Sequence, residues 1–162
     1  MIIKNDEAVM GLPVYLMVAI IVGSIVFAAF ALSIYNMHKD AQVDIVAAEI
    51  EKITAEAENM FEYADAGTQV TIHVDFPDSM SFMVFGSLPT DGISEPSDLS
   101  LNEDMSNSYY FVMDDGTMKT FSSNARFSGE LTDEIAILHP GSYNLKIELV
   151  ESEGKSYVKI YP

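Results

Sequence analysis

The side chains that could carry acid–base or metal chemistry are few and lie far apart in the sequence. The three histidines are His38, His73 and His139, and none of them belongs to a metal-ligand spacing such as H-E-x-x-H. His73 and Asp75 are two residues apart, a spacing that places both on one face of a strand, where the carboxylate would orient the imidazole. An exposed polar strand face accounts for the same spacing more simply, and we therefore predict no catalytic residue.

Other patterns that indicate catalysis or cofactor binding are missing from the sequence. Asp114-Asp115-Gly116 resembles part of a calcium loop, but the downstream acidic ligands of an EF-hand do not follow, and Asp-Gly is typical of a hairpin turn. The chain has no cysteine, which excludes a thiol nucleophile, a disulfide and a cysteine-ligated metal. It also has no G-x-S-x-G motif, phosphate-binding glycine loop or dinucleotide fingerprint. We expect a protein that is not an enzyme, with no cofactor, no metal and no small-molecule substrate.

The composition combines strong acidity with a positive mean hydropathy. The 162 residues include 8 Lys and Arg against 25 Asp and Glu, a formal net charge of −17, yet 49% are hydrophobic and the mean hydropathy is +0.17. Nucleic-acid binding requires clustered basic residues, and the 8 basic residues here are not clustered. Because charged residues lower the mean hydropathy, the apolar residues must be concentrated in one part of the chain.

The apolar residues are concentrated in Leu12–Tyr35, a run of 24 residues without a charged side chain. About 20 apolar residues are enough for a helix to cross the hydrocarbon core of a bilayer. Tyr15 and Tyr35 lie near the two ends, where amphipathic rings prefer the headgroup level. A secretory signal would have a shorter apolar region before a small-residue cleavage site, and the core helix of a small soluble domain would also be shorter. We predict one transmembrane helix over 12–35, in contact with the lipid bilayer, after a short polar segment over 1–11.

The flanking charges do not decide the orientation of this helix. Lys4 lies on one side and His38-Lys39 on the other, so the positive-inside rule gives nearly a tie. The chain from Asn36 onward carries a net charge of −16 and no cysteine, and large segments translocate largely regardless of their charge. We expect this acidic part to lie outside the cell membrane.

The helix is predicted to continue beyond the membrane. Residues 40–66 contain no Gly or Pro, and apolar residues recur at alternating spacings of three and four over three heptads. The residues of this amphipathic seam are Val43, Val46, Ile50, Ile53, Ala57, Met60 and Ala64. We therefore predict one helix over 12–35 and 36–66, with Pro13 in its first turn and Gly67 as the glycine that follows its C-terminal cap. Two alternatives are open for the seam: packing on the chain's own globular domain, or an intermolecular coiled coil.

From Gln69 the apolar period changes to 2, which indicates β-strands. The first strand holds Val70, Ile72, Val74 and Phe76 in alternation with polar residues and ends before Pro77. Further strands are predicted at Met80–Phe85, Tyr109–Met113, Met118–Phe121, Ala125–Phe127, Glu134–Leu138, Tyr143–Leu149 and Tyr157–Tyr161. About seven short strands predict a small antiparallel β-sandwich over 67–162, with a long surface loop at Ser87–Ser108. The fold class is therefore α+β, a long N-terminal helix followed by a β head.

A short polar N-terminus, an apolar helix that continues as an amphipathic one and a small β head together resemble the type IV pilin superfamily. Asp6–Pro13, followed by the apolar run with Gly23, is similar to the start of archaeal pilin-like (pseudopilin) membrane proteins. Two stretches of the head are also similar to these proteins. The first is Val74–Asp78 together with Phe85-Gly86, and the second is Leu138–Tyr143. The resemblance covers most of the chain.

The resemblance implies cleavage by a prepilin peptidase between Gly11 and Leu12. The sequence departs from the family pattern at two positions. Met10 stands where a basic residue normally precedes the cut, and Leu16 stands at the fifth mature position, where a glutamate is common. That glutamate helps to set the register of subunits, so its replacement argues against a major filament-forming pilin.

These observations lead to a structural role. We expect a non-enzymatic pilin-like subunit or accessory component of an archaeal cell-surface filament or secretion apparatus, anchored by its N-terminal helix, with a head that offers binding loops. Close packing of small residues drives the association of membrane helices. The apolar run offers such residues for self-association or for contacts with other pilin-like subunits, and they are Gly23, Ser24, Ala28, Ala29 and Ala31. The alternative is a membrane-tethered β-sandwich binding module whose helix is only an anchor.

Overall fold

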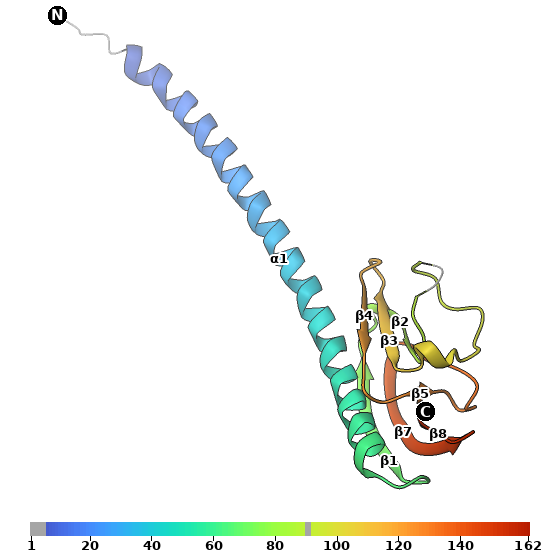
Figure 1. The fold of residues 1–162 in the computed structure, drawn as a ribbon. Coiled ribbons are helices and arrows are strands. Elements are labelled where there is room, and N and C mark those ends of the chain that lie inside the picture. The colour runs from blue at the N-terminus through green and yellow to red at the C-terminus, as the bar shows by residue number, and fades with distance from the viewer. Residues whose placement is uncertain (1–5, 90–91) are drawn as a thin grey trace, which may run out of the picture. The chain divides into compact units, whose positions relative to one another are not determined.

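The computed structural model describes residues 6–89 and 92–162, which form a long α-helix followed by two small sheets (Figure 1). The helix, α1, spans Asp6–Tyr63. The other elements are β1 (Gln69–Phe76), β2 (Met80–Phe85), a short 3-10 helix η1 (Glu103–Met105), β3 (Ser108–Met113), β4 (Met118–Ser122), β5 (Phe127–Ser128), β6 (Ala136–Leu138), β7 (Gly141–Ser152) and β8 (Lys155–Tyr161). The chain divides into two compact units, Met1–Ala41 and Gln42–Pro162, and α1 contributes residues to both.

In the first unit, the described residues belong to the N-terminal part of α1. The helix begins at Asp6, so Pro13 lies in its interior, and the prediction that Pro13 occupies the first turn is wrong. The residues between Asp6 and Pro13 include no other proline, and nothing in them prevents the helix from starting early. Because Pro13 has no backbone N–H, the helical hydrogen bond to the carbonyl of Val9 cannot form.

The second unit contains two four-stranded sheets, with strand orders β1-β7-β8-β5 and β4-β3-β2-β6. The expected arrangement of a helix followed by a head of small sheets is confirmed. Neighbouring strands are antiparallel except β5 and β8, which run parallel with Phe127 opposite Val158, so the prediction of a wholly antiparallel head is wrong for this pair. β5 and β8 are not consecutive along the chain, and no hairpin turn therefore fixes their relative direction.

The strands follow the alternation in the sequence closely. β1 pairs with β7 from Gln69 opposite Glu148 to Phe76 opposite Gly141, and the side chains of Val74 and Phe76 are buried. Two of the predicted strands are shorter in the structure: β5 has two residues where Ala125–Phe127 was predicted, and β6 has three where Glu134–Leu138 was predicted.

α1 ends at Tyr63 instead of the predicted Ala66. The chain then turns, and the carbonyl of Asp65 accepts a hydrogen bond of 3.0 Å from the backbone N–H of Thr68. Gly67 lies in this turn with φ of +91°, a conformation that glycine adopts without steric cost. The N–H of Gly67 donates to the carbonyl of Leu149 in β7 at 2.7 Å, and this hydrogen bond ties the turn after α1 to the first sheet.

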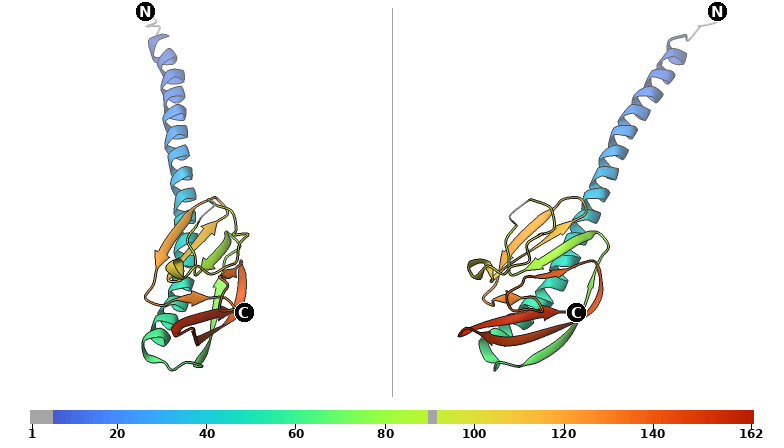
Figure 2. Two further views of the ribbon diagram at one scale, coloured as in Figure 1. Left: turned by 45° about the vertical axis from the view of Figure 1, so that its right-hand side comes forward. Right: turned by 90° about the vertical axis from the view of Figure 1, so that its right-hand side faces the viewer.

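The main hydrophobic core lies between the C-terminal part of α1 and both sheets. Figure 2 shows that part of the helix, coloured teal to green, alongside the strands from two further sides. The largest buried side chains of this core from the sheets include Phe85, Phe111, Phe127, Leu145 and Ile147. A second, smaller cluster covers the opposite face of the second sheet and consists of Phe82, Val84, Tyr110, Val112 and Ile135, with Leu101 packed against it.

The predicted loop Ser87–Ser108 lies between β2 and β3, except that its last residue, Ser108, begins β3. Residues 90 and 91 within it lie outside the described residues. The rest of the stretch contains η1 and one isolated bridge, between Ser100 and Glu134. Leu101 anchors the stretch on the second sheet, because it packs against the smaller hydrophobic cluster.

Candidate functional site

The N-terminal part of α1 presents a long apolar surface. Every residue from Pro13 to His38 is exposed, and Phe27 and Phe30 are 76% and 65% exposed. Within the described ranges, α1 is the one helix that is long and apolar enough to cross a membrane, and none of its most apolar window is buried. Exposing a contiguous apolar surface of this size to water is unfavourable, and the surface is consistent with a helix that is in contact with lipid.

The helical period separates the five small residues of the apolar run. Ser24, Ala28 and Ala31 follow each other at spacings of four and three, which places them on one face of α1. Gly23 and Ala29 project from other sides of the helix, so the five residues do not form one contact surface. The Ser24 hydroxyl donates to the carbonyl of Ile20 at 2.7 Å, which satisfies the polar group within the helix itself. Their contact with another helix stays a prediction.

The predicted cleavage point lies in the first unit. The backbone of Gly11 and Leu12 belongs to α1, while the surroundings of their side chains lie outside what the structure describes. Cleavage between these two residues stays a prediction.

The amphipathic seam is occupied by the chain's own sheets. Val46, Ile53 and Ala57 are fully buried in the main core, and Ala64 packs against the core while partly exposed. The remaining members of the seam are buried as well, and they are Val43, Ile50 and Met60. Of the two alternatives left open by the sequence, the structure therefore has the seam packed inside its own chain.

Polar contacts line the two sides of this packed helix. The Glu58 carboxylate accepts hydrogen bonds from the Ser123 hydroxyl at 2.7 Å and from the backbone N–H of Asn124 at 3.1 Å. The Gln42 side chain accepts from the hydroxyl of Ser79 at 3.0 Å, which adds a second contact near the other end of the packed segment. These hydrogen bonds add polar contacts to the apolar packing of the helix on the head.

Burial also changes the pKa of a tyrosine that lies close to the helix. Tyr109 is 9% exposed, and desolvation by burial raises the pKa of its phenol above the ordinary value. A hydrogen bond with Thr54 acts in the opposite direction, and the negative charges of Glu58 and Glu51 add to the rise of the pKa. The phenol of Tyr109 is therefore neutral at physiological pH.

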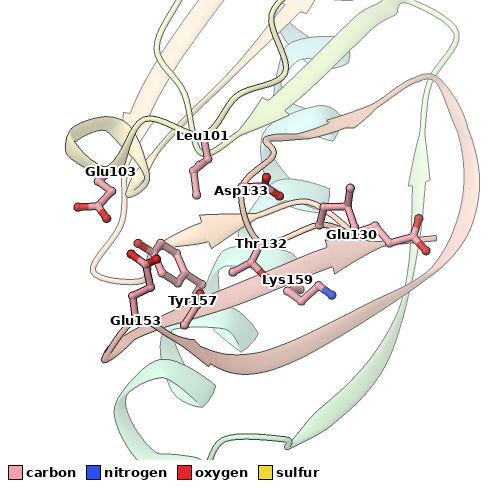
Figure 3. A pocket seen from close by; sticks show the side chains of 10 residues that line it. Leu101, Glu103, Glu130, Thr132, Asp133, Glu153, Tyr157 and Lys159 are labelled. Atoms are coloured by element: carbon pink, nitrogen blue, oxygen red, sulfur yellow. The ribbon is translucent and has the colours of Figure 1, made fainter.

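A pocket of about 470 Å³ in the head lies where the 130–133 segment meets β8 and η1 (Figure 3). Its lining combines carboxylates, one ammonium and apolar side chains. The lining residues are Leu101, Glu103, Glu130, Leu131, Thr132, Asp133, Ser152, Glu153, Tyr157 and Lys159. The carboxylates of Glu103 and Glu153 lie at one end and that of Glu130 at the other, so they do not converge on one point (Figure 3).

Glu103, one of the residues that line the pocket, belongs to an ion pair. Lys155 hydrogen-bonds to Glu103, and this hydrogen bond and the positive charge hold the pKa of the Glu103 carboxyl below its ordinary value. The same contact raises the pKa of Lys155. In the part of the chain that the structure describes, no group of three or more His, Asp or Glu side chains is placed to hold a metal ion.

The histidines stand apart from this pocket. His73 lies on the exposed face of the first sheet, where its Nδ1 is 3.1 Å from Asn144 Oδ1 and its Nε2 is 3.4 Å from Ser142 Oγ. His139 lies near Glu95, with Nε2 to Oε2 at 3.3 Å, and both groups are exposed. The sequence did not place Ser142 and Asn144 beside His73, because that proximity depends on the register between β1 and β7.

Asp114-Asp115-Gly116 forms the turn between β3 and β4, as the hairpin prediction requires. The N–H of Gly116 donates to the carbonyl of Met113 at 2.9 Å, and Gly116 has φ of +82°. The Asp114 side chain accepts from the Ser81 hydroxyl at 2.8 Å, so this carboxylate ties the turn to the neighbouring strand β2.

Comparison with known proteins gives no relative: no family model, no curated protein and no solved structure matches this chain.

Proposed function

We propose that this protein is a membrane-anchored, non-enzymatic structural subunit, similar in build to the type IV pilins of archaea, in a cell-surface filament or secretion apparatus. The N-terminal part of α1 crosses the membrane once and contacts other copies or other pilin-like subunits there. The acidic head lies outside the membrane, where its surface carries binding contacts.

One observation carries the proposal: a single helix changes from wholly exposed and apolar to packed and amphipathic. Residues 13–38 are all exposed, whereas the seam residues from Val43 to Met60 are buried in the core of the head. A helix that only anchored the head would need lipid contact alone, but Ser24, Ala28 and Ala31 also provide a face of small residues that permits close approach of a second helix.

The N-terminal segment fits processing at Gly11–Leu12. Pro13 interrupts the hydrogen bonding of α1 at this point, and a cut before Leu12 would leave Pro13 at the second residue of the shortened helix. Proline is tolerated there because the first N–H groups of a helix have no helical partner. N-terminal sequencing of the native protein tests the cut: Leu12 as first residue supports it, and Met1 contradicts it.

Self-association of the helix is tested by disulfide cross-linking in membranes. The chain contains no cysteine, so Ser24→Cys introduces a single thiol on the small-residue face. We expect oxidation to give a covalent dimer, and we expect Ala28→Leu in that background to reduce it strongly, because the added volume separates the helices. Ala29→Leu is the matched control, since this residue projects from another side, and it should leave the cross-link unchanged.

The second candidate function is a membrane-tethered binding module, and the pocket next to β8 favours it. Its volume of about 470 Å³ lies within the range typical of small-molecule sites, about 300–1,000 Å³. The same experiment separates the two functions. A Ser24→Cys protein that is inserted and folded but stays monomeric on oxidation contradicts the helix-assembled subunit and supports the tethered module.

A further inference from the structure

β4 is an open edge of the second sheet. It is the terminal strand in the order β4-β3-β2-β6, and all five of its residues are exposed. Met118 and Phe121 are large apolar side chains on this strand and are 38% and 37% exposed. An edge of this kind presents unpaired backbone groups that can add a strand from another chain.

The hydrogen-bond pattern identifies which backbone groups are free. Thr117 O accepts from Met113 N and Asn107 O accepts from Ser123 N, both at 2.8 Å. Antiparallel ladders alternate, so the residues of β4 that bond to β3 are the odd-numbered ones. The N–H and C=O groups of the even-numbered residues, with Thr120 at the centre, point away from β3.

No partner occupies these outward groups. The even-numbered residues of β4 are Met118, Thr120 and Ser122. Among residues 6–89 and 92–162, none of their backbone groups hydrogen-bonds to anything beyond the β3–β4 ladder.

Among the described residues, the other three edges are short or are bordered at one end by the helix. β5 and β6 have two and three residues, too few to add a strand stably. At the edge formed by β1, the N–H of Asp75 donates to the Glu49 carboxylate of α1 at 3.3 Å, so the helix borders that edge. β4 is thus the edge on which a further strand would fit.

The charges of the residues around β4 indicate which molecule would pair with this edge. The chain carries 25 acidic residues, yet residues 116–125 contain none and include one basic residue, Lys119. Two copies of a chain with net charge −17 repel each other, and the repulsion between two paired segments is smallest where the segments themselves contain no carboxylate. An acidic partner would be repelled by the rest of the head in the same way, but a second copy brings an equally acid-free strand to the contact.

We infer that β4 pairs with β4 of a second copy, in antiparallel register centred on Thr120. In that register all of the outward groups pair, with Thr120 opposite its counterpart and Met118 opposite Ser122 of the other copy. Lys119 then lies opposite Phe121, where its stem and ammonium contact the exposed part of the ring. A shift by two residues in one direction would bring Lys119 opposite Lys119, which like charge disfavours, and a shift in the other direction would leave Met118 opposite Asn124, outside the strand.

The ring of Phe121 is already positioned for this contact. Its ring stacks on Tyr109 and Phe111, with centroids 5.3 and 6.2 Å apart and interplanar angles of 16° and 17°. The ring therefore does not need to reorient when a second strand arrives, which lowers the entropic cost of association. A pairing of five residues is small, so the inference rests on the proposed membrane anchorage, which raises the effective concentration of one head near another.

The test uses the full chain in lipid vesicles with one cysteine in the head. Thr120→Cys places two thiols opposite each other, and oxidation should give about tenfold more covalent dimer than in the matched control. The control is Thr71→Cys, the same substitution at an exposed position on β1. Equal yields from the two variants would overturn the inference.

A second variant should prevent the pairing between the two β4 strands while it leaves the fold of the head unchanged. Thr120→Pro deletes an N–H that points away from β3, so the β3–β4 ladder keeps its hydrogen bonds, as proline on a free edge allows. Energy transfer between copies labelled at Thr71→Cys should be lower with Thr120→Pro than in the parent chain, and in the parent chain it should rise with salt as repulsion is screened. Energy transfer unaffected by Thr120→Pro would contradict the β4 contact.

The outcome is separable from that of the proposed function. A Ser24→Cys cross-link without an excess at Thr120→Cys leaves the helix association standing and removes the β4 contact. An excess at Thr120→Cys without a Ser24→Cys cross-link supports contact between heads and removes the assembly through the helix.

Discussion

The Glu58 carboxylate of α1 and the Ser123 hydroxyl after β4 are joined by a hydrogen bond of 2.7 Å, although they are 65 residues apart in sequence. Ser123 Oγ in turn accepts from the N–H of Ala125 at 3.1 Å, and Glu58 also accepts from the N–H of Asn124. The Glu58 carboxylate therefore holds the segment that connects β4 in the second sheet to β5 in the first sheet. The contact is also the polar link between the packed helix and the strand β4 to which we assign self-recognition.

Glu58→Ala should lower the free energy of unfolding by about 1–2 kcal/mol, because the Ser123 hydroxyl and the N–H of Asn124 lose their charged acceptor in a partly buried place. Glu62→Ala, an exposed position one turn further along α1, should change the free energy by less than about 0.5 kcal/mol. Urea unfolding of the detergent-solubilised chain, followed by circular dichroism, measures both values. Equal losses in the two variants would show that the Glu58 contact does not stabilise the head.

Ile53→Ala tests the packing of the seam. Ile53 is fully buried in the main core, so its truncation should cost about 2–5 kcal/mol through lost burial and the cavity that remains. Ile45 lies on the same helix but is 46% exposed, and Ile45→Ala should cost far less. A head whose melting temperature responds equally to both substitutions would mean that the seam is not packed on the sheets.

Gly86→Ala separates two costs of adding a methyl group. Gly86 has φ of +88°, and a Cβ there would lie 2.8 Å from Leu101 Cδ1 and 3.0 Å from the carbonyl oxygen of Phe127. Gly67 has a similar φ of +91° but no atom within 4 Å of the added position. Gly67→Ala should therefore cost about 1 kcal/mol from backbone strain, whereas Gly86→Ala should cost about 2–3 kcal/mol or more. Thermal unfolding of the two variants measures the difference in stability. Equal losses of stability would show that the contacts with Leu101 and Phe127 add no cost at Gly86.

Local periodicity accounts for the parts of the fold that the sequence predicts well. The alternating spacings of three and four from Val43 to Met60 mark the residues that are buried on α1, and the period of 2 from Val70 to Phe76 marks β1. Both patterns arise because one side of an element faces the core, and this is a property of neighbouring residues alone. Hairpin turns are predictable for the same reason, as with Asp114–Thr117.

Features that depend on contacts between distant segments were not predictable. The end of α1 at Tyr63 follows from the hydrogen bond that ties Gly67 to β7, and the parallel direction of β5 follows from its place beside β8. The partners of Glu58 and the surroundings of His73 depend on strand register, which sequence periodicity does not fix between distant segments. The pocket is assembled in the same way, from a loop, a 3-10 helix and β8.

The ion pair between Glu103 and Lys155 gives a prediction for pH. Lys155 lowers the pKa of Glu103, so this carboxylate contributes stability above its pKa in the unfolded chain, and the contribution is lost as the pH falls through the folded value. Glu103 raises the pKa of Lys155, so that ammonium contributes below its unfolded pKa and loses the contribution as the pH rises through the folded value. The pair is therefore effective between the acid limit set by Glu103 and the alkaline limit set by Lys155.

Both side chains of this pair are well exposed, so solvent screening leaves little effect on stability, and the pKa itself is the better observable. Lys155→Met should raise the pKa of Glu103 towards its ordinary value, measured by NMR titration of the side-chain carboxyl carbon. Lys159→Met is the matched control, because Lys159 lies on the same strand and lines the same pocket without contributing to the lowered pKa. Added salt should act on the parent protein in the direction of Lys155→Met. If the pKa of Glu103 moves equally in the two variants, the general charge of the pocket and not the specific pair sets its value.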